Sequence, residues 1–332
     1  MLENVKYLIG AAGPSGFGSA EIHVIHDSQH HFFAKFQYGW TRAGRKEDWL
    51  KLLLSRICLE ESYFSSVFSK LSPVGAAENY DGDISKVNHF GAEQAFLLSV
   101  LSEILNERVA DIVVSNHFAL SILQIMRNAV GIVDFFAMGK TGLPTGISNV
   151  DVLGCSLTIL RDIRACGGTE GSKKDISGDV VDMLASSGLV ELLISLLREF
   201  EPPAILKKTV RLSENQEASS TPSKSCSYKG FRRDVVVIVG NCAYCRKHIQ
   251  DKIREQDGIL LLLQQCVTDE DNPFLREWGI WSVRNILEGN RENKQVVASL
   301  ELQGSVDVPE IAQLGLRVEV DPQTRHVKLV NV

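Results

Sequence analysis

A glycine-rich segment near the start of the chain comes close to a nucleotide-binding motif. Gly13–Ser19 resembles a phosphate-binding loop, in which backbone N–H groups surround the phosphates and a lysine reaches them. That lysine is absent, because Ser19 directly follows Gly18. The segment favours a flexible stretch, and a nucleotide-binding protein or enzyme that uses it is the alternative function.

Four histidines form a second candidate site. Imidazole nitrogens bind transition metals, and Asp27 lies among these histidines. The surrounding sequence has no periodic apolar residues that would build a rigid scaffold. We therefore predict an exposed polar segment without a metal. The four are His23, His26, His30 and His31.

Cys242 and Cys245 form a Cys-x-x-Cys pair, and His248 follows shortly after. Tetrahedral zinc usually takes four ligands from two such pairs, and no second pair lies near. A redox motif of this spacing belongs between a strand and a helix, whereas the flanking sequence here is helical throughout. We predict packed or free thiols, no metal and no cofactor.

The sequence lacks the motifs of the common hydrolases. There is neither a Gly-x-Ser-x-Gly in a suitable context nor a His-Glu-x-x-His. The paired carboxylates Glu60–Glu61 and those of residues 269–271 are typical of solvated surfaces. We predict no catalytic residues and a protein that is not an enzyme.

The composition is that of a folded, water-soluble protein. Of 332 residues, 44% are hydrophobic and 23% are charged, and the formal net charge is −6. A nucleic-acid binder usually shows a basic excess, which is missing here. The 7 scattered cysteines fit reduced thiols, and no apolar run nears the roughly 20 residues that span a bilayer. We expect a cytoplasmic protein whose partners are proteins, with no nucleic acid and no membrane among them.

Apolar residues recur at helical spacing from about Glu47 onward. Alternating residues in Leu316–Val320 and His326–Val330 predict a small β-hairpin near the end. The predicted organisation is a poorly ordered segment at 1–45, armadillo-like helices at 46–212, a flexible polar linker at 213–229, further armadillo-like repeats at 230–302 and a tail at 303–332.

An internal repeat is the most informative pattern. Asn241 and Asn285 are 44 positions apart, and so are Ile253 and Val297. A period in the forties with helices between the repeated residues is typical of armadillo and HEAT arrays. In such arrays each helical unit buries its apolar face only against its neighbours. We therefore predict an all-α fold, a right-handed α-solenoid of armadillo or HEAT type.

The stretch of residues 231–297 resembles the C-terminal domain of the ataxin-10 family, most specifically in residues 271–285. Residues 91–163 resemble preceding helices of plant-type members. The resemblance implies an armadillo-like fold and a protein-interaction role without catalysis, in cell division, growth and development. Residues 1–44 do not resemble the armadillo helices with which members usually begin.

Five residues of the last repeats are candidates for contacts with a partner protein. They are Asn241, Asn285, Arg276, Trp278 and Arg284. The asparagines have two interpretations, since a repeated asparagine can bind a peptide in a groove or satisfy a neighbouring backbone group. Trp278 and Trp281 share one face of a helix, and we favour a core position for Trp281 because apolar residues flank it.

Thr221 is followed by Pro222 and fits the minimal pattern of proline-directed kinases. Phosphate there would add negative charge near several basic residues. Phosphorylation of Thr221 is therefore a hypothesis, and an unmodified linker is the alternative. The function that the sequence favours is a non-enzymatic protein-interaction scaffold of unidentified partners, and self-association stays open.

Overall fold

The computed structural model describes most of the helical part of the chain. The described residues are 46–73, 89–108, 112, 114–135, 142–165, 179–200, 226–300, 316–320 and 327–331. They belong to two units, one that ends at Glu288 and one that starts at Gly289. The segment predicted at 1–45 lies outside the described residues, as does Thr221.

The first unit consists of successive helices whose bounds confirm the apolar periodicity to within a few residues. They are α3 (Lys46–Leu54), the π-helical turn η1 (Ser55–Glu60), α4 (Phe64–Lys70), α5 (Ala92–Glu107), α6 (Asn116–Ile132), α7 (Ser148–Ala165), α8 (Val180–Ser186), α9 (Leu189–Glu199), α11 (Phe231–Ala243), α12 (Lys247–Glu255), α13 (Gly258–Leu263) and α14 (Leu275–Leu287).

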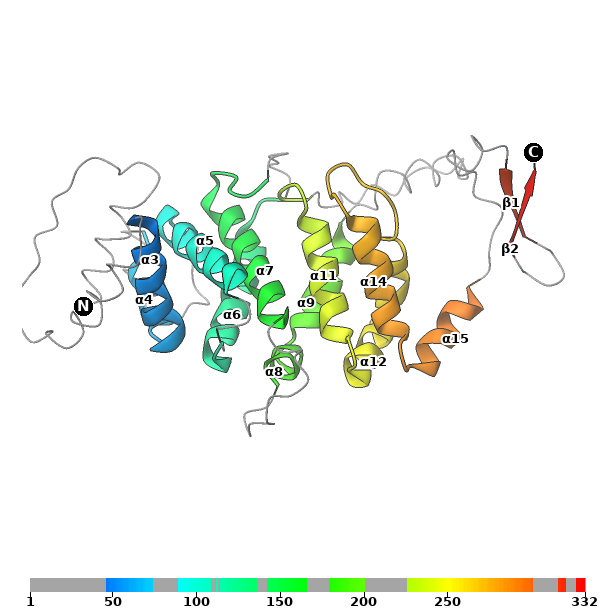
Figure 1. Cartoon of the computed structure of the whole chain (residues 1–332), viewed down its shortest axis with the longest axis horizontal. Coiled ribbons are helices and arrows are strands. Elements are labelled where there is room, and N and C mark those ends of the chain that lie inside the picture. The colour runs from blue at the N-terminus through cyan, green and yellow to red at the C-terminus, as the bar shows by residue number, and fades with distance from the viewer. Residues whose placement is uncertain are drawn as a thin grey trace, which may run out of the picture. The chain divides into compact units, whose positions relative to one another are not determined.

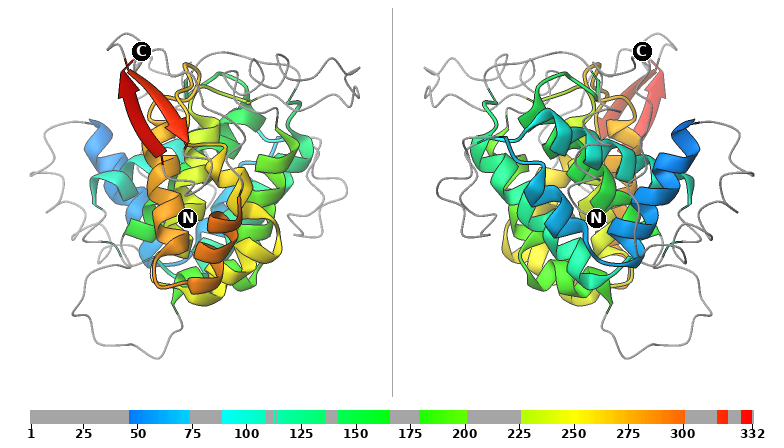
Figure 2. Two further views of the ribbon diagram at one scale, coloured as in Figure 1. Left: turned by 90° about the vertical axis from the view of Figure 1, so that its right-hand side faces the viewer. Right: turned by 90° about the vertical axis from the view of Figure 1, so that its left-hand side faces the viewer.

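The helices of the first unit follow one another in chain order along one axis (Figure 1). Helices α5, α7, α11 and α14 form a row in which each contacts the next. A second row packs on it, with α6 against α7, α9 against α11 and α13 against α14. Seen along the axis, the helices overlap, as stacked elements do (Figure 2). This arrangement confirms the predicted α-solenoid.

Helix α11 shows how completely the stack buries its inner members. Neighbours lie on several of its sides, since it contacts α7, α9, α12 and α14. Arg233 and Asn241 are its only residues that are not buried. A single helical unit could not enclose such a helix, which therefore depends on the repeats before and after it.

Aromatic rings join the helices on either side of the predicted linker. The rings of Phe200, at the end of α9, and Phe231, at the start of α11, have centroids 5.2 Å apart. Phe135 and Tyr228 lie 6.2 and 5.3 Å from Phe231. Ser227 and Tyr228, inside the linker predicted at 213–229, are thus buried, whereas Lys229 is exposed, so the prediction of an unpacked linker was wrong for these two residues. The reason is that Tyr228, 2% exposed, can bury its ring once α9 and α11 are neighbours.

Helices α11 and α14 approach closely because Gly240 has no side chain. A Cβ atom at this position would lie 2.8 Å from the Cα of Ser282, and still closer to its Oγ. Ser282 uses that hydroxyl to donate a hydrogen bond of 2.9 Å to the carbonyl of Val236. The contact between the two repeats therefore combines a missing side chain with a hydrogen bond from helix to helix.

The second unit contains helix α15 (Arg291–Ser299) and a two-stranded antiparallel sheet. Asn290 caps α15, since its side-chain oxygen accepts a hydrogen bond of 3.1 Å from the N–H of Asn293. Strands β1 (Leu316–Val320) and β2 (Val327–Asn331) pair along their whole length. The predicted hairpin is confirmed.

Among the described helices, none is both long and apolar enough to cross a bilayer by itself. Helices α8 and α9 reach the required length and hydropathy only as a pair, and they are bent by 59° at the break between them.

Gly240→Ala should destabilise the protein, because the added methyl group must push α14 away from α11. We expect the free energy of unfolding to fall by roughly 1–3 kcal/mol, as for other overpacked sites. Gly131, near the end of α6, is the matched control, since nothing lies within 4 Å of a Cβ there. Gly131→Ala should be neutral or stabilising by about 0.5–1 kcal/mol. Chemical denaturation measures both, and equal effects would contradict the close contact.

Candidate functional site

Large apolar side chains are exposed together on and beside α14. Phe274, which precedes the helix in a left-handed conformation with φ 65°, is 68% exposed. Trp278 is 37%, Ile280 53% and Trp281 47% exposed. Apolar side chains at such density on a surface mark a site of interaction. We call these four residues, which lie on more than one side of the helix, the α14 surface.

Two arginines accompany the α14 surface. The guanidinium of Arg284 lies over the ring of Trp281, 4.9 Å from its centroid. Neither Arg284 nor Arg276 forms an ion pair within the residues that the structure describes, and both are exposed. Arg276, Trp278 and Arg284 are therefore accessible to a partner, and their role in partner contacts stays a prediction.

Trp281 was predicted to fill the core between repeats, and this was wrong. Its apolar neighbours in the sequence, Ile280 and Val283, are 53% exposed and half-buried. Apolar neighbours in the sequence indicate a core only if another helix packs on them. Among the described residues, no helix of the first row follows α14. The tryptophan joins the predicted surface instead.

Asn285 lies on the buried side of α14, where it connects two repeats. It is 2% exposed, and its Nδ2 donates a hydrogen bond of 3.0 Å to the carbonyl of Gly240. Of the two interpretations of this asparagine, the structural one fits these contacts. Asn285 is therefore corrected from a partner-binding residue to a core residue, because α11 already occupies the place of a ligand.

Asn241 occupies the equivalent place in the preceding repeat but is half-buried rather than buried. It lies one residue from Gly240, which accepts the hydrogen bond from Asn285. Tyr244, three residues further, is 47% exposed. Asn241 therefore stays partly accessible, and its role as a contact residue stays a prediction.

Gln250 is a structural residue that sequence reasoning did not single out for its contacts. Its Nε2 lies 3.2 Å from the carbonyl of Ala243, 2.9 Å from that of Asn285 and 3.2 Å from that of Glu288. A single amide on α12 thus binds the C-terminal ends of α11 and α14. A glutamine in a polar segment has the same sequence pattern whether it is buried or exposed, so the sequence held no signal of this role.

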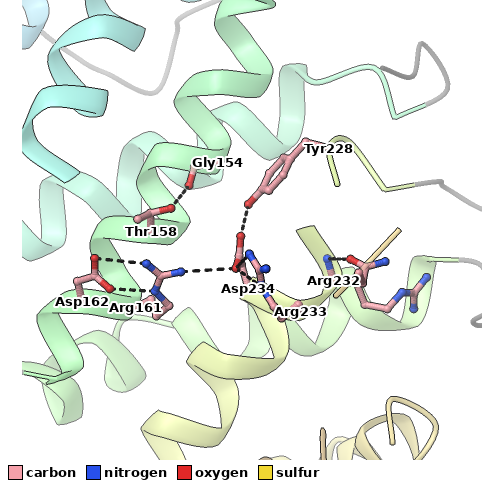
Figure 3. Close-up of polar contacts among 9 residues, drawn as sticks. Gly154, Thr158, Arg161, Asp162, Tyr228, Arg232, Arg233 and Asp234 are labelled. Atoms are coloured by element: carbon pink, nitrogen blue, oxygen red, sulfur yellow. Dashed lines mark hydrogen bonds and ion pairs between the residues drawn. The ribbon is translucent and has the colours of Figure 1, made fainter. Parts of the chain in front are cut away.

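Asp234 gathers partners from different parts of the chain (Figure 3). Its carboxylate accepts hydrogen bonds of 2.8 Å from the hydroxyl of Tyr228 and of 2.8 and 3.0 Å from Arg233. Arg161 of α7 lies 3.7 Å away and also binds Asp162 at 2.9 Å. The side chain of Asp234 is 3% exposed, so these partners compensate for its burial. The cluster joins α7, α11 and the residues before α11.

Shifted pKa values in the first unit have structural causes. Burial, with the neighbouring carboxylate of Asp234, raises the pKa of Tyr228 well above its ordinary value, so the hydroxyl stays a donor. Burial also raises the pKa of Cys58 and of Cys155 to about 12. A thiol with such a pKa is hardly ionised near neutral pH and is a poor nucleophile.

No group of three or more His, Cys, Asp or Glu side chains within the described residues could hold a metal ion. Cys242 is fully buried and Cys245 exposed, so the pair does not converge on one point. His248 lies 3.1 Å from Asp182 instead. Gly13–Ser19 and the four N-terminal histidines lie outside the described residues.

An open depression of about 490 Å³ lies between α4 and α6. Several of its polar groups are hydrogen-bonded, since the hydroxyls of Ser65 and Ser121 are 2.9 Å apart and Arg127 donates to the carbonyl of Ser187. Ser121 also contacts the backbone carbonyl of His117, not its ring. This arrangement contains no nucleophile held by a base. The α14 surface is therefore the stronger candidate site.

The stacked helices define the chain as a helical solenoid of the armadillo-like class. Its candidate site is an exposed surface of aromatic and arginine side chains. Residues 231–330 match a family model described as the spinocerebellar ataxia type 10 protein domain. This match supports the resemblance of the chain to the ataxin-10 family.

The relatives are ataxin-10 proteins of animals and their homologues in other organisms. Ataxin-10 of Bos taurus is 33% identical over 137 residues, which are 40% of this chain and 28% of that protein. Ataxin-10 of Homo sapiens is 34% identical over 133 residues, with the same shares. The ataxin-10 homolog of Dictyostelium discoideum is 38% identical over 104 residues, 31% of this chain and 17% of that protein. The chain thus spans less than a third of the length of these relatives, and no solved structure matches it significantly.

Asp234→Ala should destabilise the fold by roughly 2–4 kcal/mol, because it leaves Arg161, Arg233 and the buried hydroxyl of Tyr228 without their shared acceptor. Tyr228→Phe alone should cost about 1–2 kcal/mol. In the double variant the tyrosine change should cost much less, since its acceptor has already gone. Urea unfolding of the four proteins measures this coupling, and strict additivity would show that the cluster does not act as a unit.

Asn285→Ala should lower the stability by about 1–3 kcal/mol, because it removes the hydrogen bond to the carbonyl of Gly240 and leaves that group buried. The corresponding fall in Tm is roughly 2–6 °C. Asn106→Ala, at an exposed asparagine of α5, is the control and should leave Tm unchanged. A normal Tm for Asn285→Ala together with weakened partner binding would return this residue to the binding surface.

Proposed function

We propose that the chain is a non-enzymatic protein-interaction scaffold whose main binding surface is the α14 surface with Arg276 and Arg284. The observation that carries the proposal is the exposure of four large apolar side chains within residues 274–281. Tryptophan and arginine are the residue types that contribute most to protein interfaces. The stacking of Arg284 on Trp281 holds both side chains in place before a partner binds.

The absence of enzymatic activity is part of the proposal. Its support is the structural origin of the shifted pKa values and the resemblance to the ataxin-10 family. A cytoplasmic location and a role in cell division, growth and development are proposed from the family alone. Phosphorylation of Thr221 and nucleotide binding by Gly13–Ser19 remain open to direct tests, namely phosphopeptide mapping and a thermal shift with ATP or GTP.

Trp281→Ala should weaken the binding of partner proteins strongly. Truncation of a central interface tryptophan typically costs about 2 kcal/mol or more, which is a loss of affinity of roughly 30-fold. Tm should change little, because the side chain is half exposed. The measurement is quantitative affinity purification from native cells with the wild-type chain and the variant.

Tyr63→Ala is the matched control for this experiment. Tyr63 is an aromatic residue of similar exposure, 46%, and it precedes α4 at the other end of the first unit. Partners that are lost with Trp281→Ala and kept with Tyr63→Ala support the proposal. Retention of every specific partner by the tryptophan variant would contradict it.

A further inference from the structure

The 44-residue register relates the last helices of the chain in detail. Helices α11 and α14 each have 13 residues, and each residue of α14 lies 44 positions after its counterpart in α11. Helices α12 and α15 each have nine residues and the same offset. Equivalent positions in these pairs can therefore be compared one by one.

The comparison shows that one side of α14 lacks the cover that α11 has. Val236 is fully buried, whereas its counterpart Ile280 is 53% exposed. Gly240 is buried beneath Ser282, whereas its counterpart Arg284 is exposed. The element that covers these positions of α11 is α14 itself, through the hydrogen bond from Ser282 to the carbonyl of Val236.

The register would place the helix that covers α14 at residues 319–331. The described residues of that stretch form the strands β1 and β2 instead. Among the described residues, the last repeat therefore contains α15, the counterpart of α12, but no counterpart of α14. The side of α14 where such a helix would pack carries Arg276, Ile280, Val283, Arg284 and Leu287, and we call it the open face.

The open face has the chemistry of a helix-binding surface. Ile280, Val283 and Leu287 follow one another at spacings of three and four, so they form one apolar stripe along the helix. Arg276 and Arg284 lie one turn before and one turn after Ile280, without an ion pair within the described residues. The nearest acidic residues in the sequence, Glu277 of α14 and Glu288 after its end, are exposed and form no ion pair with the two arginines within the described residues.

We infer that the open face binds an acidic amphipathic helix of a partner protein, which packs on α14 as α14 packs on α11, at a position where no described helix lies. The inference rests on the proposed function and names the chemistry of the partner. In the row α5–α7–α11–α14, each helix before α14 is covered by the next one. A helix is therefore the element that fits against α14 in the same way. The positive charges of the two arginines favour carboxylates on that helix, because charges at the edge of an interface favour a partner of opposite charge.

A stapled synthetic helix of 13 residues provides the probe. It carries residues that α14 buries, namely Leu275, Gly279 and Ile286, and a glutamate in place of Ser282, which packs on Gly240, the counterpart of Arg284. Alanine and glutamate fill its other positions. A second peptide with lysine in place of Ser282 differs only in that charge. Fluorescence anisotropy of the labelled peptides with the full chain measures the binding.

The glutamate peptide should bind saturably, and the lysine peptide roughly tenfold more weakly. Arg284→Glu should reverse this preference. Ile280→Glu should weaken the binding of the glutamate peptide by about tenfold or more, because it places a charge in the apolar stripe. Ile147→Glu is the matched control, since Ile147 is an isoleucine of similar exposure, 47%, before α7. It should leave binding unchanged.

Failure of the glutamate peptide to bind the folded chain would overturn the inference, as would binding that ignores Ile280→Glu or the charge at position 284. Self-association of the chain that Ile280→Glu abolishes, seen by analytical ultracentrifugation, would also overturn it, because a second copy would then occupy the face. If native partners depend on Trp281 but the peptide does not bind, the proposed function stands and this inference alone fails.

Discussion

The burial of α11 between its neighbours is the constraint on which the rest of the first unit depends. A helix with almost no exposed side chain is stable only if other helices enclose it, and here these come from α7, α9 and α14. The aromatic cluster of Phe200, Phe231 and Tyr228 and the carboxylate of Asp234 secure one side of this helix. The predicted linker therefore interrupts the sequence without dividing the stack.

The other side of α11 is held in place by hydrogen bonds from polar side chains rather than by large apolar side chains. Gly240 lets α14 approach, and Ser282 and Asn285 then reach backbone carbonyls of α11. Gln250 adds a third connection at the C-terminal ends of the helices. Because a hydrogen bond depends on distance and angle more steeply than apolar contact does, these residues fix how the two repeats are spaced and aligned.

This spacing also determines which side of α14 is exposed. Inside the stack, the register position of Ile280 and Arg284 is occupied by the next helix, and at α14 it faces outward. Substitution of arginine for the glycine at this position prevents a further helix from approaching as closely as α14 approaches α11. The repeat that buries these positions in α11 thereby exposes an isoleucine and an arginine at the same positions of α14.

The sequence by itself determined the helices, their 44-residue register, the terminal hairpin and the resemblance to the ataxin-10 family, because these follow from local periodicity and from residue identities at fixed spacing. It also identified Arg276, Trp278 and Arg284 as surface candidates. Only the tertiary structure decided that Asn285 is buried and Trp281 exposed. The physical reason is that burial depends on whether a neighbouring helix covers a given side, and an isoleucine or tryptophan in a helix has the same local pattern whether or not that neighbour exists.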